Sequence, residues 1–239
     1  MRIFLAGAAG AIGRRLVPLL VRAGHEVTGT TRSAAKGNDL AQAGVSPVVL
    51  DVFDARQVSA AICAAHPEAI IHQLTDLPRE FDETRIVASY PNNARIRTEG
   101  TRNLLAAAQA ARARRFIVQS IAFAYAPGAT PHLETDPLNL ADPTRAVTVK
   151  GAAAMEQEVL LAAGLDAIVL RYGLLYGPGT WYEMPSRRPA LHVDAAAQAA
   201  LLAVSRGEPG VYNIANDDGA VAIAKARAEL GFDPEFRTT

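Results

Sequence analysis

Three glycines near the start of the chain have the spacing of a phosphate-binding turn. Residues 6–13 read Ala-Gly-Ala-Ala-Gly-Ala-Ile-Gly, which is a G-x-x-G-x-x-G pattern rather than G-x-G-x-x-G, because Ala9 takes the second glycine position. Glycines here let main-chain amides approach a pyrophosphate at the positive end of a helix dipole. A plain glycine-rich turn is the alternative. We expect a dinucleotide to be bound by Gly7, Ala9, Gly10, Ala11, Ile12 and Gly13.

The residues after the second expected strand indicate which dinucleotide binds. An acidic residue about 20 positions beyond the glycines would bind the ribose hydroxyls of NAD. The sequence has Thr30-Thr31-Arg32-Ser33 there and no carboxylate. A guanidinium suits forked contacts with phosphate, and the flanking hydroxyls add donors. We therefore expect Thr31, Arg32 and Ser33 to favour NADP over NAD, the alternative being that Arg32 stacks on the adenine or faces water.

Short apolar segments that alternate with helical patterns position these residues. Strands are expected at Arg2–Ala6, Glu26–Thr30, Pro47–Asp51, Ala69–Gln73, Arg115–Gln119, Asp166–Arg171 and Val211–Ile214. Helices are expected at Ala11–Arg22, Ala34–Ala43, Ala55–Ala64, Glu99–Ala111 and Ala152–Ala163, and long loops at Pro127–Pro143 and Gly177–Pro189. The alternation predicts an α/β fold with a doubly wound parallel sheet of the Rossmann type. Residues 1–176 would form the dinucleotide-binding domain, with a short C-terminal substrate region at 177–239 packed on it.

Composition limits the class of protein. The 239 residues include 24 Lys and Arg and 24 Asp and Glu, so the formal net charge is zero, which argues against nucleic acid or a membrane surface as partner. The single cysteine, Cys63, excludes an internal disulfide and a multi-cysteine zinc site. No stretch reaches about 18 unbroken apolar residues. We expect a cytoplasmic, soluble protein with no metal.

Further motifs follow the glycine turn in a fixed order. They are Asp51-Val52, Ile70–Thr75, Gly100–Leu105, Phe116–Ser120, Leu170–Gly179 and His192–Ala196. With them the chain resembles, over nearly its whole length, the extended or atypical short-chain dehydrogenases/reductases, the NAD-dependent epimerase/dehydratase family. The resemblance implies that Asp51 and Val52 lie by the adenine. It also implies that the ribose, diphosphate and nicotinamide are approached by Gln73, Leu74, Thr75, Tyr172, Gly173 and Leu174.

The sequence departs from the family at the catalytic pair. Family members move a proton with Tyr-x-x-x-Lys, in which the lysine lowers the pKa of the phenol. Lys150 is the lysine of this region, but Ala146 stands four residues before it. Alignment on Glu156 instead puts Thr148 at the tyrosine position and Ala152 at the lysine position, and a threonine hydroxyl ionises far too weakly to replace a phenol. Lys150 stays a candidate catalytic residue by position alone.

Two hydroxyls are the other catalytic candidates. The family's carbonyl-polarising serine or threonine stands four residues before a tyrosine that matches Tyr125, which is Ile121 here. Ser120 is one position early, so it reaches the pocket only if the strand ends there in a bulge or turn. Tyr125 is the phenol nearest the expected pocket. The alternatives are a serine bonded to backbone and an aromatic ring packed on the loop.

Substrate contacts are expected from Arg97, Trp181 and Tyr182. Arg97 replaces the family's asparagine before Gly-Thr, so it would bind an anionic substrate or be a solvated helix charge. Trp181 and Tyr182 would cap a substrate or form a dimer contact. Only twelve residues, 180–191, separate the Gly-Pro-Gly and His-Val-Asp motifs, so a sugar nucleotide would find little wall to bury it.

These observations predict an NADP-binding oxidoreductase-like protein. If it is active, it moves a hydride between NADPH and a small carbonyl or alcohol, and the proton comes from Tyr125, Ser120, water or the substrate itself. The missing tyrosine leaves open a non-catalytic nucleotide sensor or interaction protein. Epimerase or dehydratase chemistry on a nucleotide sugar is the least favoured alternative. The resemblance also implies a homodimer.

Overall fold

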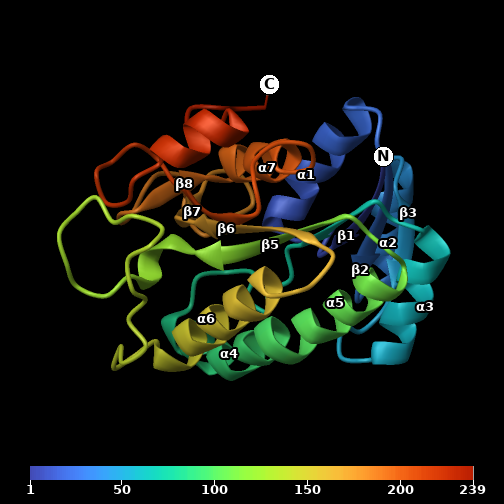
Figure 1. Ribbon diagram of the computed structural model, residues 1–239, viewed down its shortest axis with the longest axis horizontal. Helices are drawn as coiled ribbons and strands as arrows, with labels where there is room; N and C mark the ends of the chain where they lie inside the picture. The colour runs from blue at the N-terminus through green and yellow to red at the C-terminus, as the bar shows by residue number, and fades with distance from the viewer. Residues whose placement is uncertain (239) are drawn as a thin grey trace.

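A computed structural model describes residues 1–238, and their main sheet has seven parallel strands (Figure 1). The spatial order of the strands is β3-β2-β1-β4-β5-β6-β9. Their bounds are β1 Arg2–Ala6, β2 Glu26–Thr31, β3 Ser46–Val49, β4 Ala69–His72, β5 Arg115–Ile121, β6 Asp166–Tyr172 and β9 Gly210–Ile214. The order reverses between β1 and β4, and ligands of doubly wound sheets bind at the carboxyl ends of the strands at such a point. The predicted fold class is confirmed.

Helices cover both faces of this sheet (Figure 1). One face carries α1 Ala11–Arg22, α2 Ala34–Gln42 and α7 Val193–Leu202. The other carries α3 Ala55–Ala65, α4 Glu83–Arg95, α5 Thr101–Ala110 and α6 Ala146–Leu160. Two apolar cores result, one on each side, and both are built from the continuously apolar strands that the sequence indicated.

Three helices differ from the expectation. No helix was expected at Val193–Leu202, where α7 forms. The sequence analysis gave no helix at Glu83–Arg95, where Pro91 and few apolar residues weaken the periodic pattern, yet α4 forms there and packs on α6. The predicted start of α6 at Ala152 is too late. Asp142 accepts hydrogen bonds from the main-chain amides of Thr144 and Arg145, so its carboxylate supports a helix that begins at Ala146.

A wider helical turn links α4 to α5. Residues Ile96–Gly100 form a π-helical turn, η1, that continues without a break into α5. Beside it α4 and α6 cross closely. A Cβ on Gly151 would lie only 2.9 Å from Cα of Ala94, so the crossing requires glycine at this position. This crossing fixes η1 against the first turns of α6.

The C-terminal part of the chain forms a small second sheet and also adds the last strand, β9, to the main sheet. A small parallel pair, β7 (Leu174–Tyr176) with β8 (Ala190–His192), stands apart from the main sheet. Strand β9 then pairs with β6, and a π-helical turn η3 (Ala226–Leu230) follows. The domain boundary at 176/177 stays a prediction, whereas the expected loops 127–143 and 177–189 contain no helix or sheet strand.

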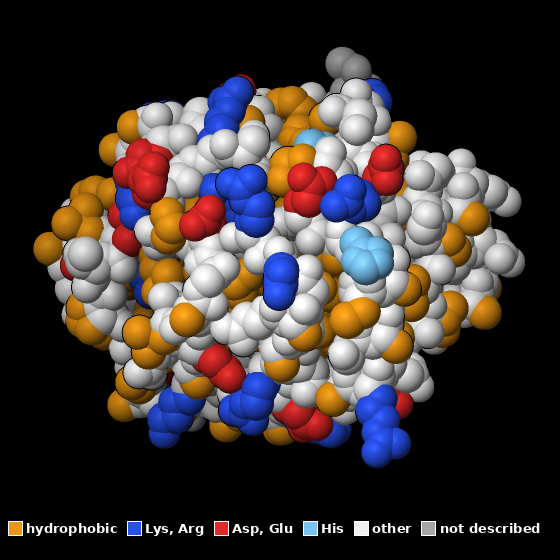
Figure 2. Space-filling view, turned by 45° about the vertical axis from the view of Figure 1, so that its right-hand side comes forward, with side chains coloured by type: hydrophobic (Ala, Val, Ile, Leu, Met, Phe, Trp, Pro, Cys, Tyr) orange, Lys and Arg blue, Asp and Glu red, His pale blue; other side chains and the backbone are white. Residues whose placement is uncertain are grey.

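The surface is mixed in charge. Figure 2 shows acidic and basic side chains interspersed over one face, in keeping with the net charge of zero. In the described part of the chain, no helix has the length and apolar character to cross a bilayer. Across residues 1–238 there is also no group of three or more side chains suited to hold a metal ion.

Candidate cofactor and substrate site

The glycine turn lies at the carboxyl end of β1 and leaves no room for larger residues. Gly7 has φ +93°, and a Cβ on it would lie 2.8 Å from the main-chain oxygen of Gln73 on the neighbouring strand. A Cβ on Gly13 would lie 2.5 Å from the oxygen of Ala8. The amide of Gly7 donates to Oγ1 of Thr30, 3.1 Å away, which ties the turn to β2. The turn is therefore a rigid, main-chain-lined cradle.

The first turn of α1 presents its amides to the same place. Gly10 is the N-cap residue, and within residues 1–238 no side chain caps the helix or adds an acidic group to its first turn. The amides at the start of α1 and the helix dipole thus favour an anion. This is the arrangement that holds a pyrophosphate in dinucleotide-binding folds.

At the end of β2, Arg32 turns toward the segment after β4. Its Nη2 lies 2.8 Å from Oδ1 of Asp76, and the Arg32 side chain is 66% exposed. The hydrogen bond from Arg32, helped by one from Asn92, lowers the pKa of the Asp76 carboxyl. Ser33 donates its amide to Oγ1 of Thr31. Sequence reasoning missed Asp76, since an acidic residue in a loop 44 positions away carries no local signal.

The ends of β3 and β4 carry further residues for which cofactor contacts are predicted. Asp51 is exposed and accepts the amide of Phe53, and the oxygen of Val52 accepts Nδ2 of Asn103. Gln73 donates its amide nitrogen to the hydroxyl of Tyr172, 3.1 Å away. Its Oε1 is buried with no partner among residues 1–238. A buried polar atom without a partner is costly, so this oxygen is suited to accept a hydrogen bond from a ligand.

His72, at the end of β4, is buried beneath the segment that begins at Gln73. Its Nδ1 accepts the amide of Leu74, so the proton lies on Nε2, which is 3.1 Å from Oγ1 of Thr101. Burial, and secondly the charge of Arg97, lowers the pKa of His72 to about 3. The imidazole is thus a neutral core group with both ring nitrogens bonded.

The catalytic candidates Ser120 and Tyr125 lie at the carboxyl end of β5, on what we call the reaction side of the site. Both belong to a buried hydrogen-bond network around Glu156 and Arg171. Ser120 donates to Oε1 of Glu156 at 2.5 Å, and Nη2 of Arg171 lies 2.6 Å from Oε2 of the same carboxylate. Tyr125 donates to Oδ1 of Asn213 at 2.6 Å and accepts from Nη1 of Arg171 at 2.8 Å. Burial raises the pKa of the Tyr125 phenol against the opposing charge of Arg171. Both hydroxyls are already donated to protein acceptors.

Helix α6 shows which of its residues face the sheet. Thr148, Ala152 and Glu156 are buried, whereas Lys150 is exposed. Ile121, at the end of β5, shares an apolar cluster with Ala152. Thr148 and Ala152, four residues apart, thus share the buried side of α6, while Lys150 is exposed. Their alignment with the family's tyrosine and lysine stays a prediction. The catalytic roles predicted for Ser120, Tyr125 and Lys150 stay predictions.

Arg97 lies in η1 and meets the first turns of α6. Its Nη1 donates to both the main-chain oxygen and Oγ1 of Thr148, at 2.9 and 2.5 Å. Burial lowers the pKa of the guanidinium to about 10, against the attraction of Glu156. Thr148 was noted in the sequence only as a replaced tyrosine, and its pairing with Arg97 was missed.

Three aromatic rings join two loops near this end of the sheet. Phe81 lies 5.9 Å from Trp181 and 5.4 Å from Tyr182, measured between ring centroids. Nε1 of Trp181 donates to the oxygen of Pro78 at 2.9 Å. The loop 177–189 is thereby fastened to the segment that follows β4. Phe81, half exposed, is a candidate contact residue that sequence reasoning missed.

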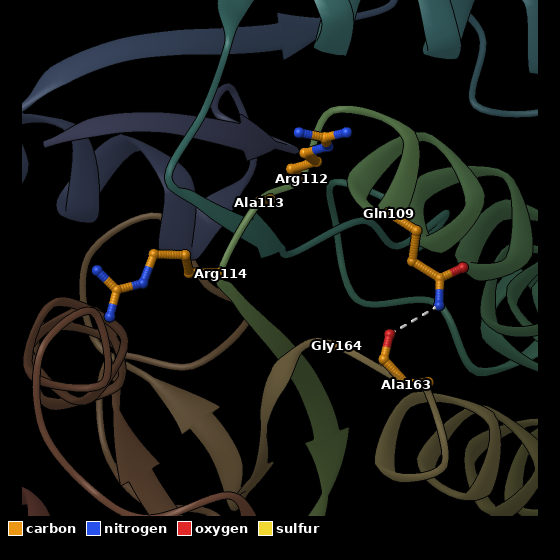
Figure 3. A pocket seen from close by; sticks show the side chains of 6 residues that line it. All are labelled: Gln109, Arg112, Ala113, Arg114, Ala163 and Gly164. Carbon is orange, nitrogen blue, oxygen red and sulfur yellow. Dashed lines mark hydrogen bonds between the residues drawn. The ribbon is translucent and has the colours of Figure 1, made fainter.

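Two hollows on the surface of the described chain lie away from these residues. One of about 320 Å³ is at the amino end of β5 (Figure 3), where Gln109 donates to the oxygen of Ala163. Another of about 580 Å³ lies between Pro131 and the segment 217–228. Neither includes a predicted site residue, and the first is at the edge of the sheet opposite the glycine turn.

Comparison with known proteins decides the family. A family described as NAD(P)H-binding matches residues 7–200. The chain belongs to this NAD(P)H-binding family. It is 38% identical over 244 residues to a Streptomyces protein named 3-diazoavenalumate denitrifying reductase, an alignment that covers 93% of this chain and 78% of that protein.

Solved structures share the fold of this NAD(P)H-binding protein. A UDP-glucose 4-epimerase from Thermotoga maritima, solved with UDP-glucose, has a TM-score of 0.80 at 19% identity, covering 99% of this chain and 94% of that one. A UDP-glucose 4-epimerase from Thermus thermophilus, solved with NAD, has a TM-score of 0.80 at 20% identity, covering 100% and 95%. These structures confirm the predicted epimerase-like fold, the family match confirms the predicted dinucleotide binding, and an oxidoreductase-type enzyme is supported.

Proposed function

We propose that this protein is an NADPH-dependent reductase that delivers a hydride to a small electrophile without donating a proton to it. The observation that carries the proposal is the contrast between an open cofactor cradle and a reaction side whose hydroxyls are already bonded. Ser120 and Tyr125 donate to Glu156 and Asn213, so neither has a free proton for a carbonyl oxygen. The likeness to a reductase supports the same conclusion.

The residues of the cradle fit a nicotinamide dinucleotide. The amides at the start of α1 would hold the pyrophosphate, and Oε1 of Gln73 would accept a hydrogen bond from the bound molecule. Arg32 would leave Asp76 to bind the extra phosphate of NADP. When bound in its reduced form, this cofactor supplies a hydride.

A diazonium group is an electrophile of the required kind. The hydride brings one hydrogen and two electrons, the carbon–nitrogen bond breaks, and dinitrogen leaves, so an arenediazonium ion and a hydride balance as arene and dinitrogen. No external proton enters this balance. The Streptomyces relative is named for a diazo substrate and for a denitrifying reduction, which favours this class over the small carbonyl compounds expected from the sequence.

The aromatic rings and the short loop would shape the substrate site. Phe81, Trp181 and Tyr182 form one cluster near the carboxyl edge of the sheet, and aromatic rings suit contact with a planar aromatic substrate. We propose that Trp181 and Tyr182 contact such a substrate, with Phe81 behind them. The short segment 180–191 provides too little protein surface to bury a nucleotide sugar. A small molecule therefore fits this site better.

The test follows NADPH absorbance with an arenediazonium salt and with a panel of aldehydes and ketones. We expect NADPH oxidation and release of dinitrogen with the diazonium salt only. A deuteride-labelled NADPH should place deuterium on the product ring, and a no-enzyme reaction gives the chemical background. Carbonyl reduction that disappears in Tyr125→Phe would instead assign Tyr125 as the acid, and tight NADPH binding without oxidation of any substrate would favour a sensor.

Cofactor choice has its own experiment. Titration calorimetry of Arg32→Ala should show NADPH affinity falling at least about tenfold, because a charge-assisted contact to the phosphate is lost, with NADH affinity nearly unchanged. Equal losses for the two cofactors would contradict the assignment of Arg32 to the extra phosphate.

A further inference from the structure

Arg97 is a cation on the reaction side that forms no ion pair with any carboxylate of residues 1–238. Within the same residues, its hydrogen bonds go only to Thr148 through Nη1. Glu156, which attracts it at longer range, is already bonded to Arg171 and Ser120. His72, the nearest imidazole to feel its charge, is neutral. Arg97 therefore keeps its positive charge without an ion pair in the described chain.

The fold holds Arg97 in a fixed place. It is three residues beyond Ala94, and Thr148 is three residues before Gly151, so the close crossing of Ala94 and Gly151 brings Arg97 and Thr148 together. Arg97 also lies within the π-helical turn η1. Such turns are rare inside α-helices and are frequent at functional sites.

The position of this pair relative to the sheet follows from α6. Glu156 bonds Ser120 on β5, and Ala152, one turn earlier, packs with Ile121 at the end of that strand. Thr148 is a further turn earlier, beyond the carboxyl end of β5. Arg97 is thus at the edge of the sheet where the glycine turn and Gln73 also lie.

We propose that Arg97 binds an anionic group of the substrate, a carboxylate, and that Thr148 is the positioning residue that holds the guanidinium for it. This inference rests on the proposed function, since it describes the substrate of the same site. The guanidinium is planar and has five N–H donors, of which Nη1 alone is engaged by protein groups in the described chain. Its remaining donors suit a forked contact with a carboxylate.

Binding of a matched pair of probes tests the inference without turnover. The probes are cinnamate and its neutral methyl ester, titrated by calorimetry into the protein saturated with NADP+. We expect the wild-type protein to bind cinnamate at least about tenfold more tightly than the ester, since the charged hydrogen bonds form only with the acid. Arg97→Met should abolish this preference and leave NADP+ affinity unchanged, and Arg97→Lys should retain part of it.

Two further measurements guard against a merely structural effect. Removal of an unpaired, partly buried charge should leave the melting temperature of Arg97→Met unchanged or higher. Thr148→Val should weaken cinnamate two- to threefold but leave the ester unaffected, and with diazonium substrates it should raise KM for a carboxylate-bearing one more than it lowers kcat. Equal binding of acid and ester by the wild-type protein, no binding of cinnamate, or a preference that survives Arg97→Met would each overturn the inference.

The proposed function fails in a different way. If cinnamate shows the Arg97-dependent preference but no diazonium salt is reduced, the anion site stands and the proposed reaction is wrong. If carboxylate-bearing and neutral diazonium salts are reduced with equal KM, and Arg97→Met changes neither, the reaction stands and the anion site is wrong.

Discussion

The cofactor side and the reaction side of this site are built from different materials. On the cofactor side, the turn from Gly7 to Gly13 is made of main chain, and no side chain among the described residues caps the start of α1. On the reaction side, hydroxyl, carboxylate and guanidinium groups bond one another in a buried network. That network draws together Ser120, Tyr125, Glu156, Arg171 and Asn213.

The difference indicates which side binds a ligand and which orders the fold. Unused donors at a helix start favour an anion from outside, whereas a network whose members satisfy each other has little to offer a substrate. Arg97 is the exception on the reaction side, because its charge has no carboxylate partner in residues 1–238. Substitutions on the reaction side should therefore affect stability first, and those on the cofactor side should affect binding.

The largest expected effect is on the buried network. Glu156→Gln leaves Arg171 as an uncompensated buried charge, so the free energy of unfolding in urea should fall by about 3–5 kcal/mol. Glu158→Gln is the matched control, because its partner Arg102 is 67% exposed and exposed pairs contribute at most about 1 kcal/mol. Equal losses in the two variants would mean that the network is not what stabilises this side.

The next effect is on the glycine turn. A Cβ in Gly13→Ala would lie 2.5 Å from the oxygen of Ala8, so the main chain must shift, and NADPH affinity measured by calorimetry should fall by more than about tenfold. Gly37→Ala in α2 is the control, since its nearest neighbour would be Cβ of Pro47 at 3.7 Å and alanine favours a helix by up to about 1 kcal/mol. Normal NADPH binding by Gly13→Ala would show that the turn does not line the cofactor.

A pH effect should arise where the two sides meet, at His72. In the unfolded chain its imidazole takes up a proton near pH 6.5, whereas in the folded protein burial keeps it neutral down to about pH 3. The unfolded state therefore binds more protons in this window, so stability falls as the pH falls, by up to about 1.4 kcal/mol per unit from this group. Urea unfolding of His72→Gln should show a shallower slope between pH 6 and pH 4. His66→Asn, at an exposed histidine, should keep the wild-type slope.

The cofactor side was predictable from sequence because its signals are local. The bounds of β1 and α1 match the expected Arg2–Ala6 and Ala11–Arg22, and the three glycines from Gly7 to Gly13 lie within seven residues. Alternation of short apolar segments with helical patterns was enough to predict the doubly wound sheet. Both features depend on neighbouring residues and on the main chain.

The rest could not be predicted because it depends on contacts between distant segments. Arg97 and Thr148 are 51 positions apart, and Arg32 and Asp76 are 44 apart. Helix α4, which precedes the turn η1 that contains Arg97, was itself missed. Pro91 and a polar composition weaken its sequence signal, and the helix is evident only from its packing on α6. A residue's type could suggest charge or a hydroxyl, but its partner came only from the fold.

The smallest effect concerns a contact that spans the cofactor side itself. Asp76 competes with any phosphate for Arg32, and the pair is exposed, with 66% and 34% of the two side chains accessible, so its contribution is at most about 1 kcal/mol. Asp76→Asn removes the competing charge while the main-chain bond from residue 76 to Asn93 is kept. NADPH affinity should therefore rise by up to about fivefold, with NADH affinity unchanged. In the Arg32→Ala background the same substitution should have no effect on either cofactor, because there is then no guanidinium to release. A gain for NADH equal to that for NADPH would mean that Asp76 repels the shared diphosphate rather than restraining Arg32, and the two sides of the site would then differ in electrostatics as well as in construction.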